Sequence, residues 1–138
     1  MLKSKVEKAS VLVVLTLTLL MTGAFQASSP MSASDLKGTW EIDLRPTPDS
    51  PPYIQLMEIT SVQGNKFTGS FYGTAMQNGR INTEWGRVIF AFVTQDGSGY
   101  YHTSGELKDG KLSGVTHSIG RDFLSPWTGV KKAYGESR

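Results

Sequence analysis

Hydrophobic side chains recur at every second position through most of this chain. From Gly38 onward, short alternating runs are separated about every ten residues by Gly, Asn-Gly or Asp-Gly. In residues 38–45, for example, Trp40, Ile42 and Leu44 alternate with charged side chains. A strand with this pattern places one face in a core and the other in water. Because no helical period competes with it, the sequence predicts an antiparallel meander of β-strands.

The predicted strands cover residues 38–45, 53–61, 66–73, 87–94, 100–107, 111–119 and 127–132. Residues 74–85 hold either a short strand broken at Asn78-Gly79 or an irregular crossing. Prolines predict a stiff loop over residues 46–52. An open meander of seven or eight strands would leave two long edges exposed. We therefore predict an all-β fold in which this up-and-down meander closes into a small barrel, with a flat sandwich as the alternative.

Asp109-Gly110 predicts a two-residue turn that sets the pairing of its two flanking strands. If Lys108 lies opposite Lys111, then Leu107 and Leu112 share a face, whereas a slip by one residue would separate them. Farther from the turn, the same register pairs Gly105 with Gly114, Thr103 with Thr116, Tyr101 with Ser118 and, on the other face, His102 with His117. The first face is thus apolar at one end and rich in hydroxyl groups at the other, as expected of a barrel interior with a polar mouth.

In two predicted hairpins, an apolar residue just after the turn is followed two residues later by a glycine. These segments are Phe67-Thr68-Gly69 and Leu112-Ser113-Gly114. A glycine in a strand allows a barrel wall to bend and another chain segment to approach closely. The repeated pattern therefore predicts close packing at both positions.

The first 24 residues have the order of a secretory signal peptide. Lys3, Lys5 and Lys8 precede an apolar run that ends near Leu20, and small residues follow it. The run is shorter than the ~20 residues of a membrane-spanning helix, which favours cleavage over a retained anchor. Cleavage is expected at residue 24 or as late as residue 29. We therefore expect an exported protein, periplasmic or extracellular, that is not held at a membrane after cleavage.

The remaining chain of about 110 residues suffices for one small domain. We expect a flexible segment over residues 25–36, the barrel over residues 37–132 and a disordered tail over residues 133–138. Removal of three lysines and Glu7 with the signal peptide lowers the net charge of +2 to about zero. This argues against nucleic acid as a partner, because phosphates require a basic surface. Without cysteine, the domain has neither disulfides nor thiolate metal ligands.

Motifs that would indicate catalysis are missing from the sequence, which has no glycine-rich phosphate loop, nucleophile elbow or His-Glu zinc motif. His102 and His117 face each other in the predicted hairpin, but two ligands do not complete a metal site, and Glu106 lies ~13 Å from His102 along the strand. Neighbours such as His117 and Ser118 point to opposite faces. We expect no metal and no cofactor, and we favour a binding protein over a small-barrel isomerase or cyclase.

The opening of the first strand resembles that of the calycins, the structural group that contains the lipocalins and avidins. Gly38-Thr39-Trp40 is similar to the Gly-x-Trp motif at the start of those barrels. The resemblance implies that Trp40 plugs the closed end of the barrel against a basic residue near the last strand. Lys131 and Arg121 are the two candidates for that basic residue.

Two further segments resemble avidin strands. Thr68-Gly69-Ser70-Phe71-Tyr72 is similar to a strand that contributes an aromatic residue to the avidin pocket. Arg80-Ile81-Asn82-Thr83-Glu84-Trp85 is similar to a string near the end of the avidin barrel, although here it falls in the middle of the chain. Glu41-Ile42-Asp43 stands where biotin recognition requires an asparagine. The resemblance therefore implies the architecture and argues against biotin as the ligand.

A pocket is predicted where the hydroxyl-rich end of the interior meets aromatic residues. Such a lining suits a small molecule with an apolar body and one polar group. The predicted ligand-binding residues are Phe71, Trp85, Tyr101, Thr103, Thr116, Ser118 and Arg121. We expect an exported, non-enzymatic binding barrel for a small hydrophobic or amphipathic ligand, with residues 46–52 as a lip. The alternative is a protein-interaction or inhibitor barrel with a filled interior, acting through the loops at residues 46–53 and 120–126.

The second and fifth predicted strands also carry apolar side chains on their outer faces, namely Ile54, Leu56, Ile89, Ala91 and Val93. Exposed apolar strands require a cover. A second subunit or a packed N-terminal segment would supply it, so a homo-oligomer through these two strands is one expected assembly.

Overall fold

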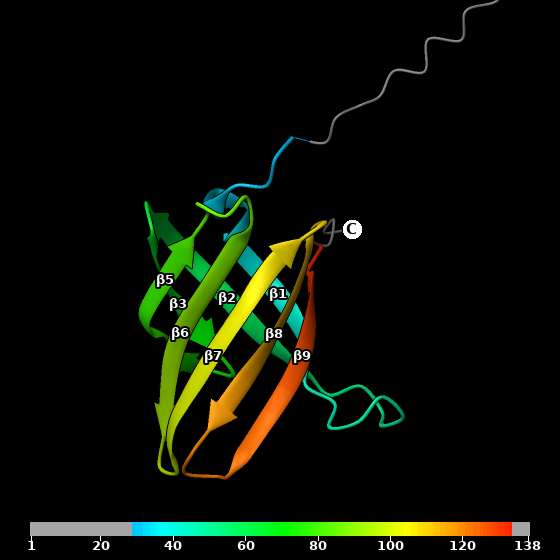
Figure 1. Cartoon of the computed structure of the whole chain (residues 1–138). Coiled ribbons are helices and arrows are strands. Elements are labelled where there is room, and N and C mark those ends of the chain that lie inside the picture. Colours follow the sequence, from blue (N-terminus) through cyan, green and yellow to red (C-terminus); the bar gives the residue numbers. More distant parts are fainter. Residues whose placement is uncertain (1–28, 134–138) are drawn as a thin grey trace, which may run out of the picture.

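The computed structural model describes residues 29–133, so the predicted signal peptide and residues 134–138 of the predicted tail lie outside the described residues. Within that range the chain forms one antiparallel sheet with strand order β2-β1-β9-β8-β7-β6-β5-β3-β4, and β2 also pairs with β3. Eight strands thus close into a barrel (Figure 1). β4 is an extra strand that pairs with β3. The predicted all-β barrel is confirmed. The strands are β1 (Gly38–Asp43), β2 (Ile54–Gln63), β3 (Lys66–Phe71), β4 (Thr74–Ala75), β5 (Gln77–Asn82), β6 (Val88–Asp96), β7 (Gly99–Lys108), β8 (Lys111–Ser118) and β9 (Phe123–Lys131).

The β7–β8 hairpin has the register that its turn predicts. Leu107 pairs with Leu112 and His102 with His117, and both leucines are buried. Asp109 and Gly110 have φ angles of 50° and 73°, which is the left-handed conformation that both central residues of a type I′ turn adopt. The turn and the alternation of the strands therefore specify the same pairing.

The interval with the weak pattern contains the two strands β4 and β5. The β5–β6 pairing shifts register between Gln77 and Arg80, at the predicted break Asn78-Gly79. Asn78 has a φ of 54°, a conformation that asparagine tolerates better than most residues. A bulged strand is thus found, and not an irregular crossing.

The last strand begins at Phe123, four residues before the predicted start. Between Phe123 and Trp127, β9 pairs with β8 alone, because its pairing with β1 begins at Thr128. Pro126 therefore lies where one side of the strand is free, and a free edge tolerates proline.

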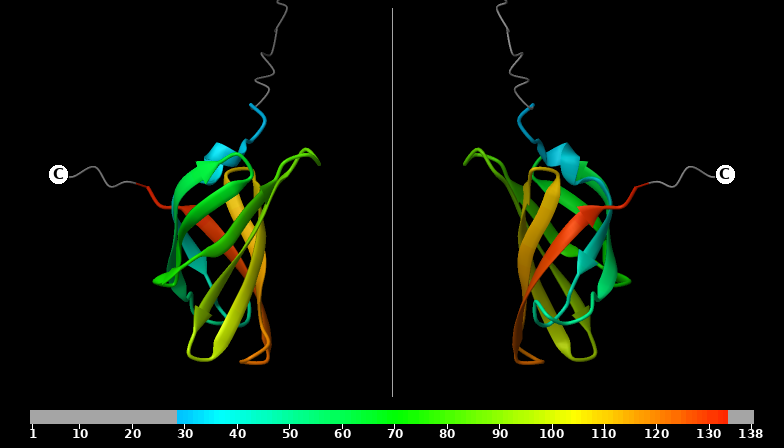
Figure 2. Two further views of the ribbon diagram at one scale, coloured as in Figure 1. Left: turned by 90° about the vertical axis from the view of Figure 1, so that its left-hand side faces the viewer. Right: turned by 90° about the vertical axis from the view of Figure 1, so that its right-hand side faces the viewer.

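A short 3-10 helix, η1 (Ala33–Leu36), covers the end of the barrel at which β1 begins (Figure 2). Leu36 is fully buried, and its carbonyl oxygen accepts a hydrogen bond of 2.9 Å from Trp40 Nε1. The predicted flexible segment, residues 25–36, thus ends in an ordered turn, because burial of Leu36 and this hydrogen bond hold it against the barrel. Within residues 29–133, no helix is long and apolar enough to cross a membrane.

The basic residue beside Trp40 is Lys131 and not Arg121. Its Nζ atom lies 5.1 Å from the centroid of the Trp40 ring and donates a hydrogen bond of 2.9 Å to the carbonyl oxygen of Asp35. A cation at this distance from an indole ring is attracted by the π-electrons. Lys131 therefore links the last strand to both β1 and η1 at the closed end.

Large side chains fill the barrel from η1 to about its middle. They come from η1 and from all eight barrel strands, and they pack around Trp40. The buried set at this end comprises Leu36, Trp40, Ile42, Met57, Ile59, Phe67, Ile81, Val88, Phe90, Leu107, Leu112 and Trp127.

The two apolar outer strips lie on different parts of the barrel wall. β2 and β6 are separated by β3 and β5 on one side and by four strands on the other. Ile54 and Leu56 on β2 are 47% and 45% exposed. One flat interface cannot cover both strands together, so a homo-oligomer that uses both would require two separate contacts.

Candidate functional site

A cavity of about 360 Å³ lies inside the barrel at the end opposite η1. Its walls are inward-facing side chains of β3, β6, β7, β8 and β9, namely Phe71, Thr94, Tyr101, Thr116, Phe123 and Ser125. Its rim comes from the strand ends and loops, with Leu44, Tyr53, Tyr72, Thr74, Asp96 and Arg121. We call these two sets the cavity walls and the cavity rim.

The cavity exists because small side chains follow large ones along the same inward face. On β8 the inward residues are Leu112 and then Thr116, and on β9 Ser125 lies two positions from Trp127. The volume of a barrel is fixed by its strand number, so smaller inward residues leave space that larger ones would fill. The gradient from apolar to hydroxyl residues predicted for this face thus coincides with the change from a filled to a hollow interior.

Four of the seven predicted ligand-binding residues line the cavity: Phe71, Tyr101, Thr116 and Arg121. Thr103 and Ser118 are buried next to it. The hydroxyl oxygens of Thr103 and Thr116 lie 3.0 Å apart. Ser118 Oγ accepts a hydrogen bond of 3.3 Å from the backbone N–H of Arg121. Both residues therefore hold lining residues in place and do not line the cavity themselves.

Trp85 does not belong to the cavity. It lies in the connection between β5 and β6, at the η1 end, and its side chain is 78% exposed. β5 runs antiparallel to β3 and so returns the chain to the η1 end before the connection that carries Trp85.

At one side of the cavity, the rim residues Asp96 and Arg121 form a polar cluster with Tyr101 of the cavity walls. The Tyr101 hydroxyl donates to Asp96 Oδ2 at 2.8 Å, and the backbone N–H of Ser98 donates to Asp96 Oδ1 at 2.7 Å. The hydrogen bond from Tyr101 is the largest cause that lowers the pKa of Asp96, followed by that from Ser98. Interaction with the Tyr101 hydroxyl is the largest cause that raises the pKa of Arg121, and the negative charge of Asp96 raises it further. Tyr101 thus lies between an anion and a cation.

The other side of the rim is a pair of tyrosines. The ring centroids of Tyr53 and Tyr72 lie 6.2 Å apart with an edge-to-face arrangement, and their hydroxyl groups are in contact. This contact raises the pKa of Tyr72. Tyr72 adopts a φ of 54°, and its N–H donates to the carbonyl oxygen of Leu56 at 3.1 Å. The pair therefore connects the residue before β2 with the residue after β3.

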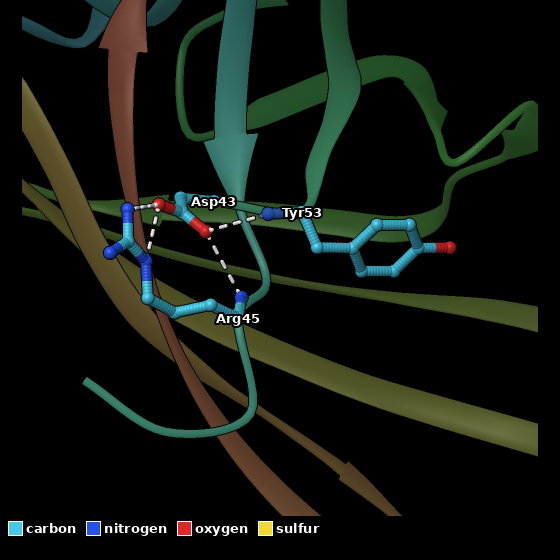
Figure 3. A network of polar contacts seen from close by, with 3 residues as sticks. All are labelled: Asp43, Arg45 and Tyr53. Carbon is cyan, nitrogen blue, oxygen red and sulfur yellow. Dashed lines mark hydrogen bonds and ion pairs between the residues drawn. The ribbon is translucent and has the colours of Figure 1, made fainter. Parts of the chain in front are cut away.

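Asp43 fixes the loop that places Tyr53 on the rim (Figure 3). Its carboxylate accepts hydrogen bonds from Arg45 Nε at 2.8 Å, from the backbone N–H of Arg45 at 3.0 Å and from that of Tyr53 at 3.2 Å. The Arg45 side chain is the main cause that lowers the pKa of Asp43 to about 2. The N–H of Leu44 also donates to the carbonyl oxygen of Tyr53 at 2.8 Å. Both ends of residues 44–53 are therefore held together.

Tyr53, Tyr72, Asp96 and Phe123 are cavity residues that the sequence reasoning missed. Asp96 continues the inward parity of Val88 to Thr94 on β6, so extending the strand by two residues would have found it. Phe123 required the earlier start of β9. The tyrosine pair spans the far end of the β2–β3 hairpin, whose register shifts between Ile59 and Ser61, so the turn at residues 64–65 and the alternation do not by themselves specify which residues meet there.

His102 and His117 lie opposite each other on the outer face of β7 and β8. Among residues 29–133, no group of three or more His, Cys, Asp or Glu side chains is arranged to hold a metal ion. The outer face therefore offers an imidazole pair without a third protein ligand in the described part of the chain.

Fold and site together define the protein as a closed eight-stranded antiparallel barrel that is filled at one end and hollow at the other. This architecture is consistent with a calycin-like barrel. No protein-family model matches the chain, and neither the curated proteins nor the solved structures include a significant match to it. The class of the protein therefore rests on its architecture.

Proposed function

We propose that this protein is an exported, non-enzymatic, calycin-like barrel that binds one small amphipathic molecule in its cavity. The observation that carries the proposal is the contrast between the two ends of the interior, one packed with large side chains and the other open over about 360 Å³. Small-molecule sites typically enclose roughly 300–1,000 Å³. This cavity falls at the lower end of that range, so the ligand is a small one.

The chemistry of the cavity walls supports an amphipathic ligand. Phe71 and Phe123 offer apolar surface, whereas Thr94, Thr116 and Ser125 offer hydroxyl groups that donate or accept hydrogen bonds. Few polar groups within an apolar lining orient a ligand without preventing the burial of its body. The N-terminal segment with its three lysines and apolar run supports export as part of the same proposal.

A pair of phenylalanine substitutions on β9 tests the proposal. Ser125 lines the cavity, whereas the neighbouring Leu124 is 66% exposed. We expect Ser125→Phe to fill the cavity and to weaken binding of the neutral dye N-phenyl-1-naphthylamine by about ten-fold or more, because the dye loses its space. Dye fluorescence measures the affinity, and thermal unfolding verifies that the variant folds.

Leu124→Phe is the matched control, since it adds the same ring on the outer face and should leave dye affinity unchanged. Equal dye binding by both variants would place the dye outside the cavity. A wild-type protein that binds no dye would favour the alternative, in which the protein acts through the proline-rich loop. That loop projects from the barrel wall (Figure 1), and a hydrogen bond of 3.0 Å from Ser50 N–H to the Thr47 carbonyl oxygen closes its tip.

A further inference from the structure

We infer that the ligand of this cavity carries an anionic group, such as a carboxylate or sulfonate, and that the guanidinium of Arg121 binds this group at the cavity rim. This inference rests on the proposed function and specifies the charge of the ligand. It depends on three features of the rim: the free donors of Arg121, the occupied acceptors of Asp96 and the fixed position of the turn that carries Arg121.

Arg121 has hydrogen-bonding capacity that the described protein does not use. Its side chain is exposed and lines the cavity. Within residues 29–133, the ion pairs closer than 4 Å are Arg45 with Asp43 and Arg87 with Glu106, and neither includes Arg121. A guanidinium has five N–H donors in a planar fork that fits a carboxylate or a related oxyanion. The single hydroxyl oxygen of Tyr101 accepts from at most two of these five donors, so most of them are free for an anion.

Asp96 is the carboxylate of this cluster, and both of its oxygens already accept hydrogen bonds. Oδ2 is bound by the Tyr101 hydroxyl and Oδ1 by the N–H of Ser98. A cationic ligand would have to displace these donors and would also meet the positive charge of Arg121. An anionic ligand meets Arg121 directly, while the hydrogen bonds to Asp96 spread the negative charge of that carboxylate.

The turn that carries Arg121 is held to the end of β8 by one hydrogen bond and closed on itself by another. The fully buried Ser118 accepts from the Arg121 N–H at 3.3 Å, and Asp122 N–H donates to the Ile119 carbonyl oxygen at 3.3 Å. A fixed backbone lowers the entropy that the arginine loses when it binds an anion. The tyrosine hydroxyls of the rim add neutral donors around the same opening.

Two dyes with the same anilinonaphthalene body isolate the contribution of the charge. 1-Anilinonaphthalene-8-sulfonate carries a sulfonate, and N-phenyl-1-naphthylamine lacks it. We expect the wild-type protein to bind the sulfonate dye about ten-fold more tightly than the neutral dye, because a charge-assisted contact adds to the shared burial of the rings. Arg121→Gln should weaken binding of the sulfonate dye about ten-fold relative to the neutral dye, so that this preference is lost.

Arg80→Gln is the matched control, because it removes one positive charge from an exposed position on β5 that does not line the cavity. It should leave the preference for the sulfonate dye intact. Binding of both dyes with equal affinity in the wild type, or an unchanged preference in Arg121→Gln, would overturn the inference while the proposed function stands. If neither dye binds to the wild-type protein, the proposed function fails and this inference fails with it.

Discussion

Trp127 fits inside the barrel because β7 and β8 carry glycine where its indole ring lies. Gly105 and Gly114 are paired directly across these strands. A Cβ atom added at Gly114 would lie 2.4 Å from Trp127 Cζ2 and 2.2 Å from the carbonyl oxygen of Ser104. At Gly69, the other glycine that the sequence pattern singles out, it would lie 1.9 Å from the carbonyl oxygen of Glu58. The close packing predicted at both positions is confirmed.

Gly114→Ala should therefore destabilise the protein by about 3 kcal/mol, because a methyl group cannot enter this space without moving the indole ring or a strand. Urea-induced unfolding measures the change in the free energy of unfolding. Gly97→Ala is the control, since no atom lies within 4 Å of its added Cβ, and surface changes of this kind stay within about 0.5 kcal/mol. Equal unfolding midpoints for the two variants would refute the packing described around Trp127.

At the scale of elements, the loop over residues 44–53 owes its position to a charge network at its base. Asp43 binds Arg45 and the backbone N–H of Tyr53, and so holds the exit from β1 next to the entry to β2. Tyr53 then reaches the cavity rim, where it contacts Tyr72. The network therefore connects the proline-rich loop to the proposed binding site.

The pKa of Asp43, lowered from 3.8 to about 2, predicts how this loop responds to acid. Because the folded-state pKa lies below the usual value, the network contributes fully above about pH 3.8 and is lost as the pH falls through about 2. NMR titration should show the amide signals of Arg45 and Tyr53 shifting with a midpoint near pH 2. Arg45→Gln should raise that midpoint towards 3.8, and a wild-type midpoint already near 3.8 would contradict the network.

The sequence predicts elements well where a turn and an alternating pattern agree. Both agree for β7 and β8, and the predicted register is observed along the whole hairpin. The prediction is less accurate where another feature interrupts the pattern. At Asn78-Gly79 a bulge breaks the alternation of β5. At Pro126 the strand continues because its edge towards β1 is free.

The accuracy of the predicted site depends on the same signals. Tyr101 and Thr116 lie in the hairpin with the clear pattern, and both line the cavity. Trp85 follows the interval with the weak pattern, and it lies at the η1 end of the barrel, away from the cavity.

At the scale of the whole molecule, closure of the sheet creates relations that no local pattern contains. Pairing of the first strand, β1, with the last, β9, places Trp40 directly opposite Lys131. The Gly-x-Trp resemblance anticipated a basic residue at Trp40, but closure decides between Lys131 and Arg121. It leaves Arg121 at the opposite end of the barrel, on the rim of the cavity.

The central claim is that one end of this barrel is a packed plug and the other is a binding cavity. The most direct measurement is an NMR titration with N-phenyl-1-naphthylamine that follows backbone amide signals of the whole chain. We predict saturable shifts at Phe71, Thr94, Thr116 and Phe123, with the signals of the filled end around Trp40 and Leu112 unchanged. Shifts confined to the filled end or to the outer face at His102 and His117 would contradict the claim.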